Sequence, residues 1–226
     1  MIKKITIVIA QPRSGSTLLM RLINNCTPLI MSGDRQPEVY QALLLLHEHR
    51  LRGAIYGLPS QLEEGSIFCD HYNGFDEYTQ YRATSKIIID TLSPLYHKTQ
   101  YLLVKTGILG FGNEYLVPFV KMMRERFENV KFVYLTRDHS EIVNSMLTTD
   151  HPMASELSEK ILYDFLLRQH EQILEAYQSS YGKDSYITYD SLCELPEWCI
   201  SLVTDSKIYT SCIAEVMGKK LRNPAY

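Results

Sequence analysis

The sequence has few cysteines, a single tryptophan and no long apolar run. Its 226 residues contain five cysteines, an odd number, and no two of them form a C-x-x-C pair. This spacing supports neither a zinc knuckle, nor a dithiol redox motif, nor a framework of disulfide bonds. We therefore interpret the cysteines as reduced thiols of a cytoplasmic protein. No stretch approaches the roughly 20 apolar residues that span a bilayer, so we expect no membrane span.

We also expect no secretory signal peptide at the start of the sequence. Lys3 and Lys4 precede a short apolar run over residues 5–10. The run is too short for a signal peptide, and the polar residues 11–13 follow it without a small-residue cleavage site. We expect an unprocessed chain that stays in the cytoplasm.

The sequence has no large excess of charge of one sign. The formal net charge is −3 and the pI is about 6.2, so the surface does not fit nucleic acid, which needs a basic face. A hydrophobic share of 45% and a charged share of 22% predict one compact domain over residues 1–226. We expect this domain to be a monomer or a homodimer. Weak periodicity over residues 51–81 is typical of an irregular insertion, which we place beside the functional site.

Apolar strands alternate with helical segments along the chain. The β-branched and apolar residues at 4–10 are typical of a strand buried on both faces of a parallel sheet. Further strands are expected at 86–89, 101–104 and 130–135, and helices at 18–23, 39–50, 114–127, 140–147 and 155–179. This alternation predicts an α/β fold, a P-loop-like three-layer sandwich in which helices flank a central parallel sheet.

Residues 10–17, between the first strand and the first helix, resemble a phosphate-binding loop. Against the pattern G-x-x-x-x-G-K-[ST], Gly15 and Thr17 fit, whereas Ala10 replaces the first glycine and Ser16 replaces the lysine. Arg13, together with backbone N–H groups at a helix N-terminus, would still hold a phosphate, although not a magnesium-bound triphosphate. The alternative is an ordinary polar turn capped by Ser or Thr.

A second candidate anion site follows the strand at 130–135. Arg137 lies at the carboxyl end of this strand, and Ser145 lies eight residues later in the next helix. We expect both side chains to converge on one phosphate. In the alternative interpretation, Arg137 pairs with a carboxylate and Ser145 is a solvated helix residue.

The two motifs, in this order, resemble those of the sulfotransferases that use 3′-phosphoadenosine 5′-phosphosulfate (PAPS). Residues 12–19 look like the family's 5′-phosphosulfate loop in the Arg-containing form of bacterial and tyrosylprotein sulfotransferases, and residues 130–145 look like its 3′-phosphate motif. His139 departs from the family, which usually has Pro or Gly there. The resemblance implies a donor site made of Arg13, Ser14, Gly15, Ser16, Thr17, Arg137 and Ser145.

Three weaker matches extend the resemblance over more of the chain. Lys105 is similar to the family's strand-end lysine, and Tyr189 is similar to the tyrosine of its Tyr-Glu-x-Leu segment near the donor. Residues 207–224 are similar to the C-terminal segment that closes over the nucleotide. This last match implies further donor contacts from Lys207, Tyr209, Thr210 and Ser211.

The resemblance also implies a carboxylate base about two dozen residues after the loop arginine. Asp34 stands where the family usually has a glutamate after a glycine. Glu38 is the competitor, because some bacterial members carry the base in a Pro-x-Glu segment. Asp34 is otherwise a turn or N-cap carboxylate ahead of the next helix.

The function implied by the resemblance is transfer of a sulfuryl group from PAPS, the co-substrate, to a hydroxyl or amine of a small-molecule acceptor. In an in-line displacement the carboxylate takes the acceptor's proton, Arg13 contacts the phosphosulfate, and Lys105 offsets charge on the leaving oxygen, without a metal. The insertion at 51–81 would then lie on the acceptor side. Two alternatives stay open: a P-loop-type nucleotide kinase, and a catalytically inactive nucleotide-binding protein of the same fold.

Overall fold

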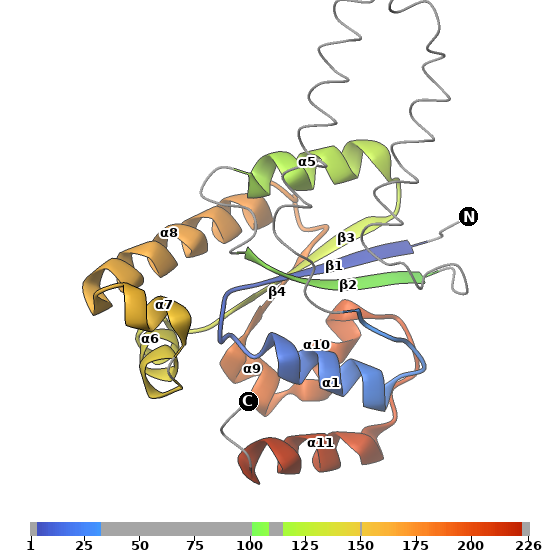
Figure 1. Cartoon of the computed structure of the whole chain (residues 1–226). Coiled ribbons are helices and arrows are strands. Elements are labelled where there is room, and N and C mark those ends of the chain that lie inside the picture. Colours follow the sequence, from blue (N-terminus) through green and yellow to red (C-terminus); the bar gives the residue numbers. More distant parts are fainter. Residues whose placement is uncertain (1–3, 33–100, 109–114, 150, 223–226) are drawn as a thin grey trace, which may run out of the picture.

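The described residues of the computed structural model, 4–32, 101–108, 115–149 and 151–222, form a central sheet of four parallel strands (Figure 1). In sheet order the strands are β2 (Tyr101–Gly107), β1 (Lys4–Ala10), β3 (Val130–Thr136) and β4 (Ser185–Thr188). Every pair of neighbours is parallel. All four carboxyl ends therefore meet at one edge of the sheet.

The strands form where apolar runs are buried from both sides. Six of the seven residues of β1 and five of the seven residues of β2 are buried, as expected for a parallel sheet that helices cover. β1 pairs with both neighbours, so Val8 lies between Lys105 of β2 and Val133 of β3. The expected strands at 4–10, 101–104 and 130–135 are confirmed, the last two with longer carboxyl ends.

Helices cover both faces of the sheet (Figure 1). On one face lie α5 (Leu116–Arg126) and α8 (Glu159–Gln178), and on the other lie α1 (Ser16–Cys26), α10 (Pro196–Val203) and α11 (Thr210–Arg222). Each face has its own apolar core, with Phe119 and Ile173 in the first and Leu19 and Ile200 in the second. The predicted three-layer α/β sandwich is thereby confirmed.

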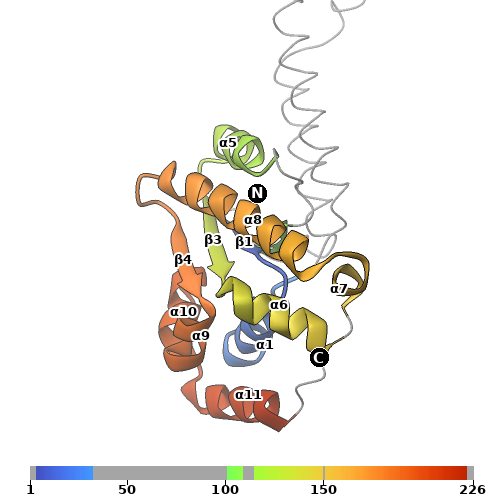
Figure 2. The same cartoon turned by 90° about the vertical axis from the view of Figure 1, so that its left-hand side faces the viewer.

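Two further helices, α6 (His139–Thr148) and α7 (Pro152–Glu156), lie beyond the carboxyl edge of the sheet (Figure 1 and Figure 2). α6 packs against α8, where Ile142, Met146 and Leu166 join a third apolar cluster. α9 (Tyr189–Glu194) begins directly after β4. Because these connections are short, the first turns of α6 and α9 stay next to the strand ends that precede them.

The structure differs from the sequence prediction at residues 155–179. One helix was expected there, but α7 ends at Glu156 and α8 begins at Glu159. The break occurs because the Ser158 hydroxyl caps the new helix and accepts a hydrogen bond from the N–H of Ile161 at 3.4 Å. The negative charge of Glu159 in the first turn favours the same start.

Other expectations are met or fall outside the structure. The helices expected at 114–127 and 140–147 correspond to α5 and α6. The sequence patterns do not predict β4, α9, α10 or α11. The expected strand at 86–89, the helix at 39–50 and the insertion at 51–81 lie outside the described residues. Within the described part of the chain, no helix combines the length and the apolar character needed to cross a membrane.

Candidate functional site

The carboxyl edge of the sheet gathers the residues of both sequence motifs. The loop over residues 11–15 follows β1, Arg137 follows β3, and Tyr189 follows β4. Lys105 lies in β2, two residues before the strand ends. In open parallel sheets, ligands bind outside the carboxyl ends of the strands. This edge is therefore the candidate site.

The loop after β1 turns back in a left-handed conformation. Arg13 and Gly15 have φ angles of 58° and 91°. The buried hydroxyl of Ser14 donates a hydrogen bond to the carbonyl of Gln11 at 2.7 Å. Nε2 of Gln11 donates in turn to the carbonyl of Leu166 in α8 at 3.1 Å. These bonds hold the loop to its own strand end and to a helix on the far side of the sheet.

Among the residues that the structure describes, no side chain caps the N-terminus of α1. The N-cap residue is Gly15, and it offers no side-chain oxygen to the first turn of the helix. The first N–H groups of a helix have no partner inside the helix, and they carry partial positive charge that attracts anions. The Ser or Thr cap of the alternative interpretation is therefore not observed, because Gly15 takes the N-cap position.

Gly15 also lies in direct contact with the ring of Tyr189. A Cβ atom at this position would lie 2.6 Å from Cδ2 and 2.8 Å from Cε2 of Tyr189. Atoms of a folded protein do not approach so closely, so the loop reaches α9 only because residue 15 has no side chain. The structure thus brings Tyr189 to the loop after β1.

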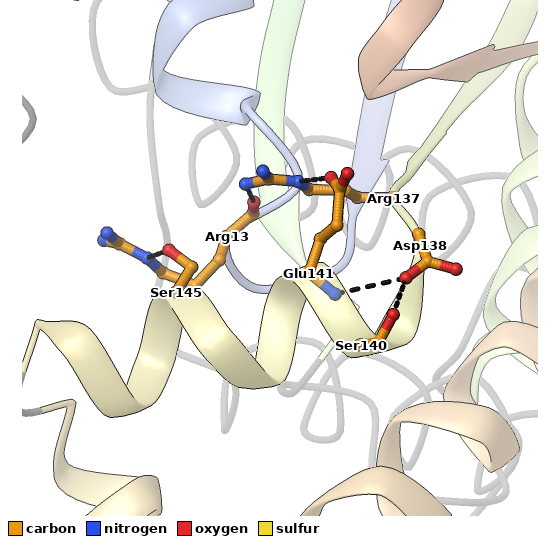
Figure 3. Close-up of polar contacts among 6 residues, drawn as sticks. All are labelled: Arg13, Arg137, Asp138, Ser140, Glu141 and Ser145. Atoms are coloured by element: carbon orange, nitrogen blue, oxygen red, sulfur yellow. Dashed lines mark hydrogen bonds and ion pairs between the residues drawn. The ribbon is translucent and has the colours of Figure 1, made fainter.

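Arg137 is held from three directions (Figure 3). Its Nε donates to Oε2 of Glu141 at 2.7 Å, and its Nη1 donates to the carbonyl oxygen of Arg13 at 3.4 Å. Its guanidinium carbon lies 4.1 Å from the centre of the Tyr189 ring, in a cation–π contact. The side chain is only 21% exposed. The alternative in which Arg137 pairs with a carboxylate is therefore observed, with Glu141 as the partner.

Ser145 is hydrogen-bonded to Arg13. Nε of Arg13 donates to Oγ of Ser145 at 3.1 Å (Figure 3). Ser145 is half-buried, so it is not the solvated residue of the alternative interpretation. Arg137 reaches the same loop through its hydrogen bond to the carbonyl of Arg13. The sequence predicted that Ser145 and Arg137 converge on one phosphate, whereas the structure pairs Ser145 with the loop arginine.

Asp138 fixes the start of α6. Its carboxylate accepts hydrogen bonds from the Ser140 hydroxyl and, at 3.1 Å, from the N–H of Glu141 (Figure 3). These two hydrogen bonds hold the pKa of Asp138 below its ordinary value. An ionised N-cap also interacts favourably with the positive end of the helix dipole. The first turn of α6, which carries Glu141, is therefore well defined.

Lys105 is buried within the sheet, with 3% of its surface exposed. Side chains alternate along a strand, and Leu103 belongs to the core on the α1 side, so Lys105 faces the same side. Its neighbour on β1 is Val8, two residues before that strand ends. This position puts a basic side chain beside the strand that carries the phosphate loop, on the face that α1 covers.

The C-terminal residues of the predicted donor site lie elsewhere. The N–H of Tyr209 donates to the carbonyl of Cys26 at 2.7 Å, and Cys26 is the last residue of α1. The loop over residues 11–15 directly precedes the first residue of this 11-residue helix. The helix is about 16 Å long. The structure therefore does not bring Lys207, Tyr209, Thr210 and Ser211 to the loop.

A hollow of about 220 Å³ lies beside Arg137 and Tyr189. His139, His170 and Tyr186 also line it. The two imidazole rings meet edge to face, with their centres 4.9 Å apart. Burial lowers the pKa of both histidines, so both rings are neutral at pH 7. Among the described residues, no group of three His, Cys, Asp or Glu side chains lies where it could hold a metal ion.

Three residues of this region were not found by sequence reasoning. Glu141 had a local signal, because it lies four residues after Arg137, a spacing at which opposite charges meet. Gln11 and His170 had none, because their partners come from distant parts of the chain. The two candidate bases, Asp34 and Glu38, lie outside the described residues.

Comparison with known proteins identifies solved structures that share this fold. No protein-family model matches the chain, and no curated protein matches its sequence. Among solved structures, the sulfotransferase domain from the Synechococcus PCC 7002 olefin synthase is similar over 99% of this chain and 78% of its own, with a TM-score of 0.51 and 17% identity. The sulfotransferase domain from the curacin biosynthetic pathway is similar over 95% of this chain and 74% of its own, with a TM-score of 0.50 and 17% identity. The chain has the sulfotransferase fold.

A kinase is also among the similar structures. Shikimate kinase from Bacteroides thetaiotaomicron matches over 87% of this chain and 98% of its own, with 12% identity. The TM-score of this match is 0.41. At these identities the likenesses describe the arrangement of helices and strands, and the chemistry has to be argued from the site itself.

Proposed function

We propose that this chain is a sulfotransferase, which moves a sulfuryl group from PAPS to a hydroxyl or amine of a small-molecule acceptor. The observation that carries the proposal is the gathering of Arg13, Arg137, Ser145 and Tyr189 around the phosphate loop at the carboxyl edge of the sheet. The fold shared with two sulfotransferase domains supports the same reaction class. We also propose that residues 1–226 form a single domain and that the protein is cytoplasmic.

In this proposal the two arginines hold the two ends of the donor. Arg13 and the N–H groups of residues 14–17 bind the 5′-phosphosulfate, and Arg137 binds the 3′-phosphate. The Ser145 hydroxyl accepts a hydrogen bond from Arg13, so its own hydrogen is available for a phosphate oxygen. The ring of Tyr189 covers one face of Arg137 and excludes water from it. Residues 207–211 are left out, because they lie at the far end of α1.

The chemical step is an in-line displacement at sulfur. The acceptor oxygen or nitrogen forms a bond to sulfur while the bond between sulfur and the bridging oxygen breaks, and adenosine 3′,5′-bisphosphate leaves. Lys105 offsets the negative charge that develops on the bridging oxygen. Asp34 or Glu38 takes the proton of the acceptor. Positioning and charge provide most of the rate enhancement, as in phosphoryl transfer.

The experiment that tests the proposal compares two nucleotides. Adenosine 3′,5′-bisphosphate is expected to raise the melting temperature, because a ligand present at 100 times its Kd stabilises a fold by about 2.7 kcal/mol. ATP with Mg²⁺ is expected to raise it far less, because Ser16 stands where a kinase loop has lysine. Equal shifts with both nucleotides would favour the kinase, and no shift with the bisphosphate would overturn the donor assignment.

A pair of arginine variants makes this measurement specific to the site. Arg137→Ala is expected to weaken the binding of adenosine 3′,5′-bisphosphate and so to reduce the shift that this ligand causes. Arg21→Ala is the matched control, because Arg21 is an exposed arginine on α1 outside the site. The control should give the same shift as the unchanged protein.

A further inference from the structure

We propose that Glu141 is a positioning residue, which holds the guanidinium group of Arg137 in the orientation that binds an anion. The inference rests on the proposed function and assigns a role to a residue of the 130–145 segment to which the resemblance gave none. Glu141 accepts the Nε–H of Arg137 at 2.7 Å. Because a guanidinium group is planar and rigid, fixing Nε together with one terminal nitrogen fixes where the other terminal nitrogen points.

The geometry around Arg137 leaves one end of its guanidinium group for a ligand. Nε is bonded to Glu141, Nη1 is bonded to the carbonyl of Arg13, and the ring of Tyr189 lies 4.1 Å from the guanidinium carbon. Among the described residues, none accepts a hydrogen bond from Nη2. Figure 3 shows the terminal nitrogens pointing toward the loop and away from Glu141.

Helix α6 repeats this arrangement one turn further along. Ser145, four residues after Glu141, accepts the Nε–H of Arg13 at 3.1 Å (Figure 3). Neighbouring turns of one helix face thus hold the Nε atoms of two arginines, one from the loop after β1 and one from the end of β3. On Arg137 this leaves Nη2 to bind the anion, because Nη1 is bonded to the carbonyl of Arg13. The spacing of the two basic groups is therefore set by a single rigid element.

The charge of Glu141 makes the inference testable, because two roles predict opposite results. If Glu141 only repelled or displaced the anion, removing its carboxylate would tighten anion binding, as Coulomb's law requires. If Glu141 positions Arg137, removing the carboxylate weakens binding although a negative charge has been lost. The carboxylate is half exposed, and such pairs contribute little to the stability of the fold. Binding and unfolding are therefore separable.

The experiment measures the affinity of Glu141→Ala and Glu141→Gln for adenosine 3′,5′-bisphosphate and for pyrophosphate, by calorimetry at fixed ionic strength. We expect Glu141→Ala to bind at least tenfold more weakly at an unchanged melting temperature. Glu141→Gln should recover most of the loss, because its side-chain carbonyl still accepts the Nε–H. In an Arg137→Ala background the effect of Glu141→Ala should vanish, since it acts through Arg137.

The matched control is Glu215→Ala, which removes the carboxylate of another pair with i,i+4 spacing, that of Lys219 and Glu215. It should leave both affinities within twofold. Equal or tighter binding by Glu141→Ala would overturn the inference and leave the proposed function intact. Binding of pyrophosphate alone, with the same dependence on Glu141, would support the inference and overturn PAPS as donor. If the unchanged protein binds neither ligand, both are overturned.

Discussion

At the scale of single residues, Gly15 meets two requirements at once. Its φ angle of 91° lies in the left-handed region that glycine adopts without strain. The space where a Cβ would lie is taken by the ring of Tyr189. The contact between the loop and α9 therefore depends on the absence of a side chain, as does the turn that aims the first N–H groups of α1 outward.

Replacing Gly15 by alanine tests both requirements. We expect Gly15→Ala to lower the free energy of unfolding by about 1–3 kcal/mol, the cost of a left-handed non-glycine residue, and to weaken the binding of adenosine 3′,5′-bisphosphate because Tyr189 must move. Gly218→Ala is the control, because Gly218 lies in α11, and apart from the adjoining helix backbone no atom of the described residues lies within 4 Å of its added Cβ. Alanine there should stabilise the helix by about 0.5–1 kcal/mol.

Urea unfolding measures the stability of both glycine variants. A Gly15→Ala variant that is as stable as the unchanged protein, and that binds the bisphosphate equally well, would contradict the conformation described for the loop. The two substitutions add the same methyl group, so the difference between them reports the backbone angle and the contact with Tyr189.

At the scale of elements, α6 and α8 meet through two half-buried imidazoles. His139 is the first residue of α6, and His170 lies in α8. Burial lowers the pKa of both, and for His170 the charge of His139 adds to the effect. Asp138 acts in the opposite direction on His139 but does not outweigh burial. Protonation of either ring therefore disfavours the packing of these helices.

This contact predicts how stability depends on pH. The folded pKa of each histidine lies below its unfolded value of about 6.5, so between the two values the unfolded chain binds more protons. The stability that depends on the neutral rings is therefore complete above about pH 6.5 and is lost as the pH falls below it. Urea unfolding between pH 7.5 and 5.5 should show this loss.

The double variant His139→Gln, His170→Gln isolates the two rings. We expect its stability to fall less over the same pH range, whatever its stability at pH 7.5. Burial raises the pKa of Asp184, the carboxylate just before β4, so this group acts with the opposite sign at lower pH. It is present in both proteins, so its effect cancels in the comparison. The same pH dependence in both proteins would refute the role of the histidines.

The elements also show what the sequence could and could not predict. β1, the loop and α1 were predictable, because a buried strand and a glycine turn leave local patterns. β4 has only four residues, too few for a clear alternation. The break before α8 depends on one capping serine. The position of residues 207–211 depends on how α11 packs along α1, a tertiary contact that no local pattern records.

The same distinction holds within the candidate site. Arg13 and Arg137 were predictable because strand ends of a parallel sheet meet at one edge, and Ser145 followed from its spacing after Arg137. Tyr189 was implied only by the resemblance, since β4 was not predicted. The pairing of these side chains was not predictable, since Ser145 bonds to Arg13 and Arg137 bonds to Glu141. Which donor meets which acceptor depends on side-chain orientations, and these are set by packing across distant segments.

At the scale of the whole molecule, the basic groups of the site contrast with a net charge of −3. Arg13 and Arg137 converge at one edge of the sheet, and Lys105 lies in the strand next to the loop. A basic site in an otherwise mildly acidic protein favours a small anionic ligand over a long polyanion. The fold itself does not decide the reaction, because one fold supports many functions.

Transfer of labelled sulfur tests the central claim most directly. The protein is incubated with ³⁵S-labelled PAPS and a small-molecule extract of its native source, beside Lys105→Met, which keeps the apolar stem and removes the ammonium group. We predict a labelled small molecule with the unchanged protein, and transfer slower by about a hundredfold or more with Lys105→Met at unchanged affinity for adenosine 3′,5′-bisphosphate. Tight binding of the bisphosphate without any labelled product would contradict the account and favour an inactive nucleotide-binding protein.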